Sequence, residues 1–170
     1  MTDRSFNACY RNDARILVLG SLPGKRSIEA QRYYAHPRNA FWPILCDYLS
    51  LDKSVGYDVS LHAAIEAGVA LWDVVSEAER PGSLDSAIKP SSVVFNPIAG
   101  LIDTLPSLHS VLLNGGKAMA LFKQAGLKPV CEARGICVQQ MPSTSPAFAA
   151  ISVEQKKRAW ISAFESALSR

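Results

Sequence analysis

The densest run of side chains that could do chemistry lies between residues 33 and 42, which read Tyr-Tyr-Ala-His-Pro-Arg-Asn-Ala-Phe-Trp. Two tyrosines, a histidine, an arginine and an asparagine within ten residues are dense for a purely structural loop. The side chain of Asn39 is a weak base, but its carbonyl oxygen can orient a water molecule. Asn39 also suits the N-cap of a helix that is predicted to begin at Ala40, so the two interpretations compete for one oxygen.

A turn that contains two glycines precedes this run and reads Gly-Ser-Leu-Pro-Gly-Lys from residue 20 to residue 25. Glycines at the end of a strand let the backbone approach a ligand closely, and a helix N-terminus after them attracts anions. The turn is neither a phosphate-binding P-loop nor a dinucleotide fingerprint, because the glycine spacings of both motifs are absent.

Three more polar positions follow predicted strands: Asp73, Asn114 and the segment 142–147, which reads Pro-Ser-Thr-Ser-Pro-Ala. Asp73 is either a recognition group or a residue that caps or bridges its own loop. Asn114 precedes Gly115, and Asn-Gly is above all a turn signal with a positive φ. A Ser/Pro-rich segment is commonly no more than a loop.

Short apolar runs predict the strands that must position these residues, over 15–19, 69–75, 110–113 and 136–141. The runs are continuous rather than alternating, which is typical of strands buried on both faces of a parallel sheet. Helix signals between and after them predict helices over 40–49, 61–67 with Ser60 as N-cap, 97–105 with Asn96 as N-cap, 117–125, and 153–168 with a capping box at Ser152.

Strands that alternate with helices predict an α/β fold, a three-layer α/β/α domain with a parallel sheet. In such sheets ligands bind beyond the carboxyl ends of the strands. The loops that leave those ends, and that should build any site, are 20–39, 73–84, 114–117 and 142–151.

The composition fits one domain over residues 1–170, since 48% of the residues are apolar and 19% are charged. No apolar run approaches the length of a membrane span, and the charged N-terminus does not suit a signal peptide, so we expect a soluble, cytoplasmic monomer. A net charge of +3 permits a polyanionic partner without indicating one. The four cysteines include no C-x-x-C pair, which predicts free thiols and no metal site.

Six collinear blocks of the chain together resemble one family: 20–24, 33–44, 70–75, 82–88, 113–115 and 142–147. They are similar to the hypoxanthine-DNA glycosylases, family 6 of the uracil-DNA glycosylase superfamily, from about residue 15 to residue 165. The resemblance implies a four-stranded parallel sheet between helices. It also implies a monofunctional glycosylase that removes deaminated bases from DNA, chiefly hypoxanthine, and leaves an abasic site without a metal or a cofactor.

Two alternatives stay open at this point. The first is a glycosylase specific for uracil or for G:T and G:U mismatches, but the related mismatch enzymes have an asparagine where this chain has Leu22. The second is a nucleotide-binding α/β module without catalysis, which has no need of Asn39.

The resemblance also assigns roles to single residues around an extruded base. It implies that Asn39 holds the attacking water, that Tyr34 stacks on the base, and that Asp73 reads the edge of the base. An ionised carboxylate only accepts hydrogen bonds, so Asp73 would favour the N1–H of hypoxanthine over the bare N1 of adenine. Ser21 and Asn114 complete the expected base-binding group.

The segment 142–147 is similar to the loop of the superfamily that contacts the minor groove. Short hydroxyl side chains suit contacts with phosphates. We therefore expect Ser143 and Ser145 to bind the DNA backbone, together with Arg38 and Lys25 from the first loop.

Overall fold

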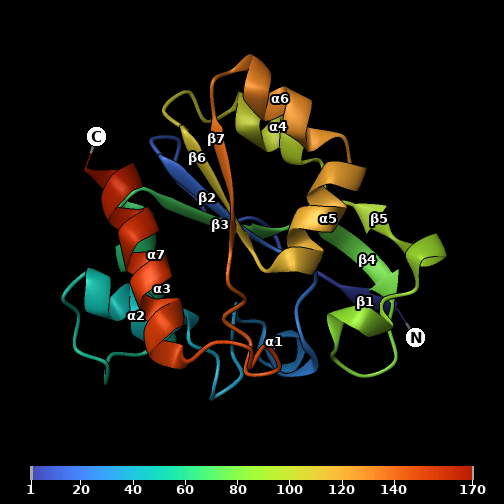
Figure 1. The fold of residues 1–170 in the computed structure, drawn as a ribbon, viewed down its shortest axis with the longest axis horizontal. Helices are drawn as coiled ribbons and strands as arrows, with labels where there is room; N and C mark the ends of the chain where they lie inside the picture. The colour runs from blue at the N-terminus through green and yellow to red at the C-terminus, as the bar shows by residue number, and fades with distance from the viewer. Residues whose placement is uncertain (1, 170) are drawn as a thin grey trace.

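Four parallel strands form the centre of the structure, a computed structural model that describes residues 2–169 (Figure 1). Their order across the sheet is β3 (Val69–Asp73), β2 (Ile16–Gly20), β6 (Ser110–Asn114) and β7 (Cys137–Met141). Every residue of β2 and of β6 is buried. The parallel sheet is confirmed, and the expected burial on both faces holds for β2 and β6 but not for β7, in which three of the five residues are exposed.

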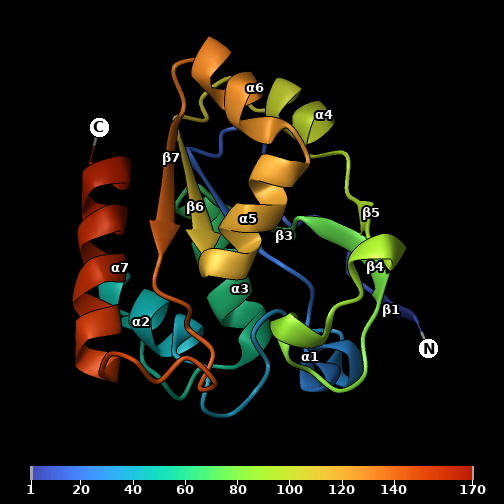
Figure 2. The same cartoon turned by 45° about the vertical axis from the view of Figure 1, so that its right-hand side comes forward.

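Successive residues of β2 point into two separate cores. Leu17 and Leu19 belong to the core that is covered by α4 (Ile98–Asp103), α5 (Gly116–Gln124) and α6 (Leu127–Ala133). Ile16 and Val18 belong to the core that is covered by α2 (Phe41–Tyr48), α3 (Tyr57–Glu66) and α7 (Val153–Leu168). The two groups of helices lie on opposite faces of the sheet (Figure 2), which confirms the three-layer α/β/α architecture.

The predicted N-cap residue is right for α7 and wrong for α3 and α4. At α7 the Oγ of Ser152 accepts from the Gln155 N–H at 3.1 Å, and the Gln155 Oε1 accepts from the Ser152 N–H at 2.8 Å, so the capping box is present. The helix α3 begins earlier than predicted, after Gly56, so that Ser60 is a buried residue inside the helix. Asn96 does not cap α4, because its Nδ2 donates to the Asp73 carbonyl at 2.8 Å, where β3 ends.

A second, smaller sheet was not expected from the sequence. It is antiparallel and has the order β1 (Thr2–Arg4), β4 (Val75–Glu79) and β5 (Val94–Phe95). The predicted strand over 69–75 is therefore two strands, with a break at Val74. Four short elements also lie outside the predicted helix ranges: the helices α1 (Lys25–Ala30) and α6, and the 3-10 turns η1 (Asp85–Ala87) and η2 (Pro90–Ser92).

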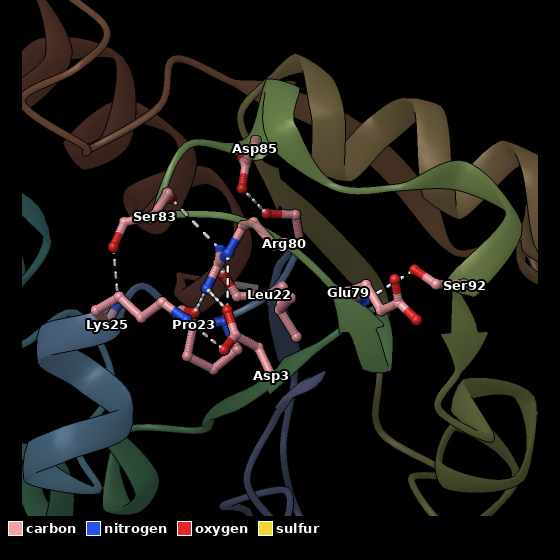
Figure 3. Close-up of polar contacts among 10 residues, drawn as sticks. Asp3, Leu22, Pro23, Lys25, Glu79, Arg80, Ser83, Asp85 and Ser92 are labelled. Carbon is pink, nitrogen blue, oxygen red and sulfur yellow. Dashed lines mark hydrogen bonds and ion pairs between the residues drawn. The ribbon is translucent and has the colours of Figure 1, made fainter. Parts of the chain in front are cut away.

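A buried ion network ties this second sheet to the turn after β2 (Figure 3). The side chain of Arg80 is fully buried, and its Nε and Nη2 donate to the Oδ2 of Asp3 at 2.9 Å and 2.7 Å. The same guanidinium donates to the carbonyls of Pro23 and Ser83. Burial would raise the pKa of Asp3, but hydrogen bonds and charges from Lys25 and Arg80 outweigh it and hold that pKa below its ordinary value. The network therefore fixes two loops at the carboxyl edge of the parallel sheet.

The four cysteines are free thiols, as predicted. Within residues 2–169, the helices are all too short or too polar to span a membrane.

Candidate active site

A cavity of about 700 Å³ lies at the carboxyl edge of the parallel sheet, where the fold predicted a site. Its size suits a small-molecule ligand or a single extruded group. The loops after the four parallel strands supply its walls, and the nine residues singled out by the sequence all line it: Ser21, Lys25, Tyr34, Arg38, Asn39, Asp73, Asn114, Ser143 and Ser145.

Asp73 is the last residue of β3 and lies in register with Gly20 of β2. The residue is 3% exposed, and its buried Oδ2 has no hydrogen-bond partner within the described part of the chain. Burial, and then the nearby charge of Asp85, raise the pKa of Asp73 to about 7 against the opposing charge of Arg80. This carboxyl group can therefore be neutral or charged near physiological pH.

Tyr34 lies beside Asp73 in a left-handed backbone conformation, with φ of 54°. Its ring packs on Phe41 with 4.4 Å between the ring centroids, and its buried hydroxyl has no partner among residues 2–169. Burial, and then the charge of Asp73, raise the pKa of the Tyr34 hydroxyl well above its ordinary value. The neighbouring Tyr33 serves the core instead, with its hydroxyl bound to the Asn7 carbonyl at 2.9 Å.

The Asp73 carboxyl and the Tyr34 hydroxyl converge over Gly20, which leaves no room for a side chain. A Cβ at Gly20 would lie 2.5 Å from the Oδ1 of Asp73 and 3.5 Å from the Tyr34 hydroxyl. Gly20 is thus needed for the close approach of two side chains of the protein itself, whereas the sequence analysis expected the backbone to approach a ligand.

We predict that Gly20→Ala lowers the free energy of unfolding by about 1–3 kcal/mol, because the added methyl group overpacks a buried site. Chemical denaturation measures the loss. Gly100→Ala is the matched control, since Gly100 lies in α4 with nothing within 4 Å of the added Cβ. A helical Gly→Ala change should be neutral or stabilising there. Equal effects of the two substitutions would contradict the close contact at Gly20.

Asn39 both supports the start of a helix and faces the cavity. Its Oδ1 accepts from the backbone N–H of Phe41 at 3.0 Å, so it supports the start of α2 although the N-cap residue is Ala40. The side chain also lines the cavity. A carbonyl oxygen has two lone pairs, so the bond to Phe41 orients the amide and leaves a lone pair for a water molecule.

Asn114 is committed mainly to structure. Its Nδ2 donates to the Oγ1 of Thr144 at 2.9 Å, and its Oδ1 accepts from the Thr144 N–H at 2.9 Å. The following Gly115 has φ of 103°, as the turn signal predicted. Asn114 therefore anchors the 142–147 loop, and the remaining N–H of its amide is what it can offer a ligand. Thr144, which is 1% exposed, is a site residue that the sequence analysis did not single out.

A buried lysine holds the same loop from the other side. Lys156 of α7 is 3% exposed and donates to the Ser145 carbonyl at 3.0 Å, with its ammonium 5.3 Å from the centre of the Phe148 ring. Burial lowers the pKa of this lysine. Lys156 lies at helical spacing from the buried Trp160 and Phe164, so the pattern of α7 was a signal for its burial, whereas its partner Ser145 could only be found in the structure.

The two loop serines form short turns with the backbone that follows them. The Oγ of Ser143 accepts from the Ser145 N–H, and the Oγ of Ser145 accepts from the Ala147 N–H, each at 3.2 Å. Because a hydroxyl both accepts and donates, each serine keeps its own O–H for a ligand.

Ser21 forms a pair with a second carboxyl group of the cavity. Its Oγ donates to the Oδ1 of Asp85 at 2.7 Å. Burial raises the pKa of Asp85, although the Ser21 hydrogen bond and the charges of Arg80 and Lys117 oppose the shift. Asp85 lies in the block 82–88, which was part of the family resemblance but received no role in the sequence analysis. Its place in that block was the signal that could have identified Asp85 as a site residue.

The two predicted basic contacts differ in their surroundings. Arg38 is exposed at the cavity, and its backbone N–H is held by the Nδ1 of His36 at 3.0 Å. Lys25 is different, since its Nζ is bound to the Oδ1 of Asp3 at 2.6 Å. A phosphate would therefore compete with Asp3 for Lys25, and the contact of Lys25 with the DNA backbone stays a prediction.

Across the described residues, no group of three or more His, Cys, Asp or Glu side chains is placed to hold a metal ion.

Comparison with known proteins shows which family has a similar sequence and structure. The family model of the uracil DNA glycosylase superfamily matches residues 7–169. A protein of Methanosarcina barkeri named hypoxanthine DNA glycosylase is 33% identical over 166 residues, which cover 97% of this chain and 99% of that protein. A protein of the same name from Methanosarcina acetivorans is 32% identical over 148 residues, covering 86% and 89% of the two chains. The solution NMR structure of a candidate uracil DNA glycosylase from Methanosarcina acetivorans superposes with a TM-score of 0.81 at 30% identity and covers 100% of both chains.

Proposed function

The chain belongs to the uracil DNA glycosylase superfamily, and from this premise we propose that it is a DNA repair enzyme that hydrolyses the N-glycosidic bond of deaminated bases. The name shared by the two archaeal relatives supports hypoxanthine in deoxyinosine as the chief substrate. The product would be an abasic site, because the assigned reaction uses a water molecule held by Asn39 rather than a lysine nucleophile. All nine assigned residues come from one chain, so a monomer suffices.

The observation that carries the proposal is the buried polar floor of the cavity. The Oδ2 of Asp73 and the hydroxyl of Tyr34 are buried there without partners among the described residues. Buried polar atoms are rarely left unsatisfied, because each one costs about 1–3 kcal/mol. A base that enters the cavity with its hydrogen-bonding edge toward Asp73 would satisfy that site.

The mechanism follows from the positions of three side chains. An enzyme that acts on a base must first rotate it out of the duplex, which is least costly for a mispaired base. The ring of Tyr34 then offers a stacking surface, and Asp73 receives the N–H edge. Asn39, whose amide is oriented by the Phe41 N–H, holds a water molecule toward C1′ while the base departs with the electrons of the glycosidic bond.

The cavity mouth supplies groups for the DNA backbone. Arg38 and the hydroxyls of Ser143 and Ser145 line the cavity on two neighbouring segments, and they would contact phosphates beside the extruded nucleotide. A hydrogen bond from the Ala40 N–H to the Thr144 carbonyl joins the two segments at 3.0 Å. Phe148 is 36% exposed at the end of the 142–147 loop and is the side chain we assign to the gap left by the base.

We predict that Arg38→Ala reduces the salt dependence of DNA binding. Each phosphate neutralised by the protein contributes about −0.9 to the slope of log affinity against log salt, so the slope should become shallower by about that amount. Fluorescence anisotropy with a labelled duplex at several salt concentrations measures it. Lys25→Ala is the comparison, because Lys25 is paired with Asp3 and its loss should change the slope less. A larger change for Lys25→Ala than for Arg38→Ala would reverse the assignment.

A panel of duplexes tests the proposed function. Each duplex carries one inosine, uracil, xanthine or mismatched thymine, and the free base released is identified in the presence of EDTA. We expect hypoxanthine to be released fastest, with no metal required. Faster release of uracil or thymine from mismatches would favour the mismatch-specific alternative. Binding of nucleotides without release of any base would favour a non-catalytic module.

A further inference from the structure

Two carboxyl groups, those of Asp73 and Asp85, share the cavity, and their hydrogen-bonding surroundings differ. Asp85 accepts a hydrogen bond from Ser21 at 2.7 Å, whereas the buried Oδ2 of Asp73 receives none from any described residue. A buried carboxylate without a donor is costly unless it is paired, and in practice such a group takes up a proton. A donor on Asp85 favours its charged form.

The other ionisable groups around the two carboxyls preserve this difference. The charge of Asp85 raises the pKa of Asp73. Tyr33 and Tyr34, in contrast, stay neutral where Asp73 titrates, because burial and the charge of Asp73 raise the pKa of each hydroxyl well above its ordinary value. Arg80 is the nearby cation, but its guanidinium is already engaged by Asp3 and by the Pro23 and Ser83 carbonyls. The charged form of Asp85 is favoured by the hydrogen bond from Ser21 and by the charges of Arg80 and Lys117. Of the two carboxyls, Asp85 therefore loses its proton first.

We propose that Asp73 meets the base as a neutral carboxyl group, and that Asp85 is the positioning residue whose negative charge keeps the proton on Asp73. The neutral group has one acceptor and one donor side by side. It accepts from the N1–H of hypoxanthine and donates to O6, the oxygen on which negative charge develops as the base leaves. The same pair also matches the N1 and the 6-amino group of adenine, so the preference for hypoxanthine over adenine then has to come from the rest of the pocket and from the weaker pairing of inosine in the duplex. This inference rests on the proposed function and adds to it the protonation state of the recognition group.

The proposal also explains how guanine could be kept out. Guanine has the N1–H and O6 of hypoxanthine together with a 2-amino group. An ionised carboxylate would accept from both the N1–H and the amino group, so it would prefer guanine, the abundant normal base. A neutral carboxyl satisfies the N1–H and O6 pair alone and leaves the amino group of guanine without an acceptor, which is penalised in a buried site.

The raised pKa of Asp73, about 7, agrees with this geometry and fixes the pH range of the tests. The ordinary pKa of the residue is 3.8. The folded protein therefore holds a proton that the unfolded chain has released between these values, and stability contributed by this group falls as the pH rises through that interval.

A first test needs no catalytic activity. Asp73→Asn replaces the acid with a neutral amide of the same shape, so the variant should gain thermal stability relative to the parent as the pH rises from about 4 to 7, with a constant difference above 7. Asp103→Asn on α4 is the control, because Asp103 is exposed and outside the cavity. A difference in melting temperature that does not depend on pH would show that Asp73 is already ionised in the folded protein.

The second test is the pH dependence of single-turnover release of hypoxanthine. The parent should lose about tenfold in rate per pH unit above 7, as Asp73 ionises. Asp73→Asn should release hypoxanthine more slowly than the parent at about pH 6, because an amide replaces the acid at the edge of the base, but it should lose this alkaline decline, since the amide also pairs with N1–H and O6. Asp85→Asn should move the decline to lower pH by about one unit, because a neighbouring negative charge has been removed.

The outcomes separate this proposal from the proposed function. Absence of base release by the parent at every pH would overturn the function itself. Release by the parent, together with an inactive but folded Asp73→Asn variant or an unchanged alkaline decline in Asp85→Asn, would overturn the neutral carboxyl and the role of Asp85 while leaving the function intact.

Discussion

Asn39→Ala is expected to lower the single-turnover rate of base release by about 100-fold or more, while the affinity for DNA stays within about twofold of the parent. The reason is that the oriented water contributes when the glycosidic bond breaks, whereas the bound DNA is held mainly by phosphate contacts and stacking. Rapid-quench assays with enzyme in excess measure the rate, and anisotropy measures the affinity.

The control for this substitution has to separate the water from the start of α2. Alanine removes both the water contact and the 3.0 Å bond from the Phe41 N–H to the side chain. Asn39→Ser supplies a shorter acceptor that can still form such a turn, but it has no amide to reach the water. We expect the serine variant to recover most of the lost melting temperature and little of the lost rate. An alanine variant with full activity and a lower melting temperature would mean that Asn39 serves the helix alone, and Ser21 would then be the next candidate.

Arg80→Met is expected to lower the free energy of unfolding by about 3–5 kcal/mol, the range for removing one partner of a buried ion pair. The substitution leaves the 5% exposed carboxyl of Asp3 with Lys25 as its remaining cation. It also frees the carbonyls of Pro23 and Ser83, which belong to the two loops that frame the cavity. Denaturant titration measures the loss, and base release should fall with it at temperatures where the variant is folded.

Lys25→Met provides the matched comparison for Arg80. Lys25 binds the same carboxylate, but its side chain is 34% exposed, so water can replace part of the interaction. We expect a loss several times smaller than that of Arg80→Met. Equal losses for the two variants would show that the buried position of Arg80 adds nothing to the pair.

The parts of the fold that follow from local sequence were predicted well. The strands β2 and β6 are buried throughout, so their continuous apolar runs were enough to predict strands of a parallel sheet. The carboxyl edge of that sheet then placed the site loops together before any contact was known. The capping box of α7 is equally local, since its two partners lie three residues apart.

The errors come from contacts between distant segments. Ser60 was the better capping residue by type, but α3 starts after Gly56, where the hydroxyl of Tyr57 accepts from the Tyr33 N–H at 3.0 Å. The strand β4 carries two glutamates and pairs with a three-residue strand at the N-terminus, so neither strand shows an apolar pattern of its own.

The same division between local signals and distant contacts applies to the candidate site. Residue types identified which side chains to consider, and the structure brings all of them to one cavity. Their partners were not predictable from spacing, because Asn114 meets Thr144 thirty residues later and Lys25 meets Asp3 twenty-two residues earlier. Those partners decide which groups are free to act: they commit most of Asn114 and Lys25 to structure and leave Asp73 open to a ligand.

The most direct test of the central assignment is a single-turnover incubation of the protein with a duplex that carries one deoxyinosine, in EDTA, with both products identified. We expect free hypoxanthine and an equal amount of uncut strand that contains an abasic site. No base released from this duplex or from a matched uracil duplex, by a protein shown to be folded, would contradict the assignment of this cavity to base excision.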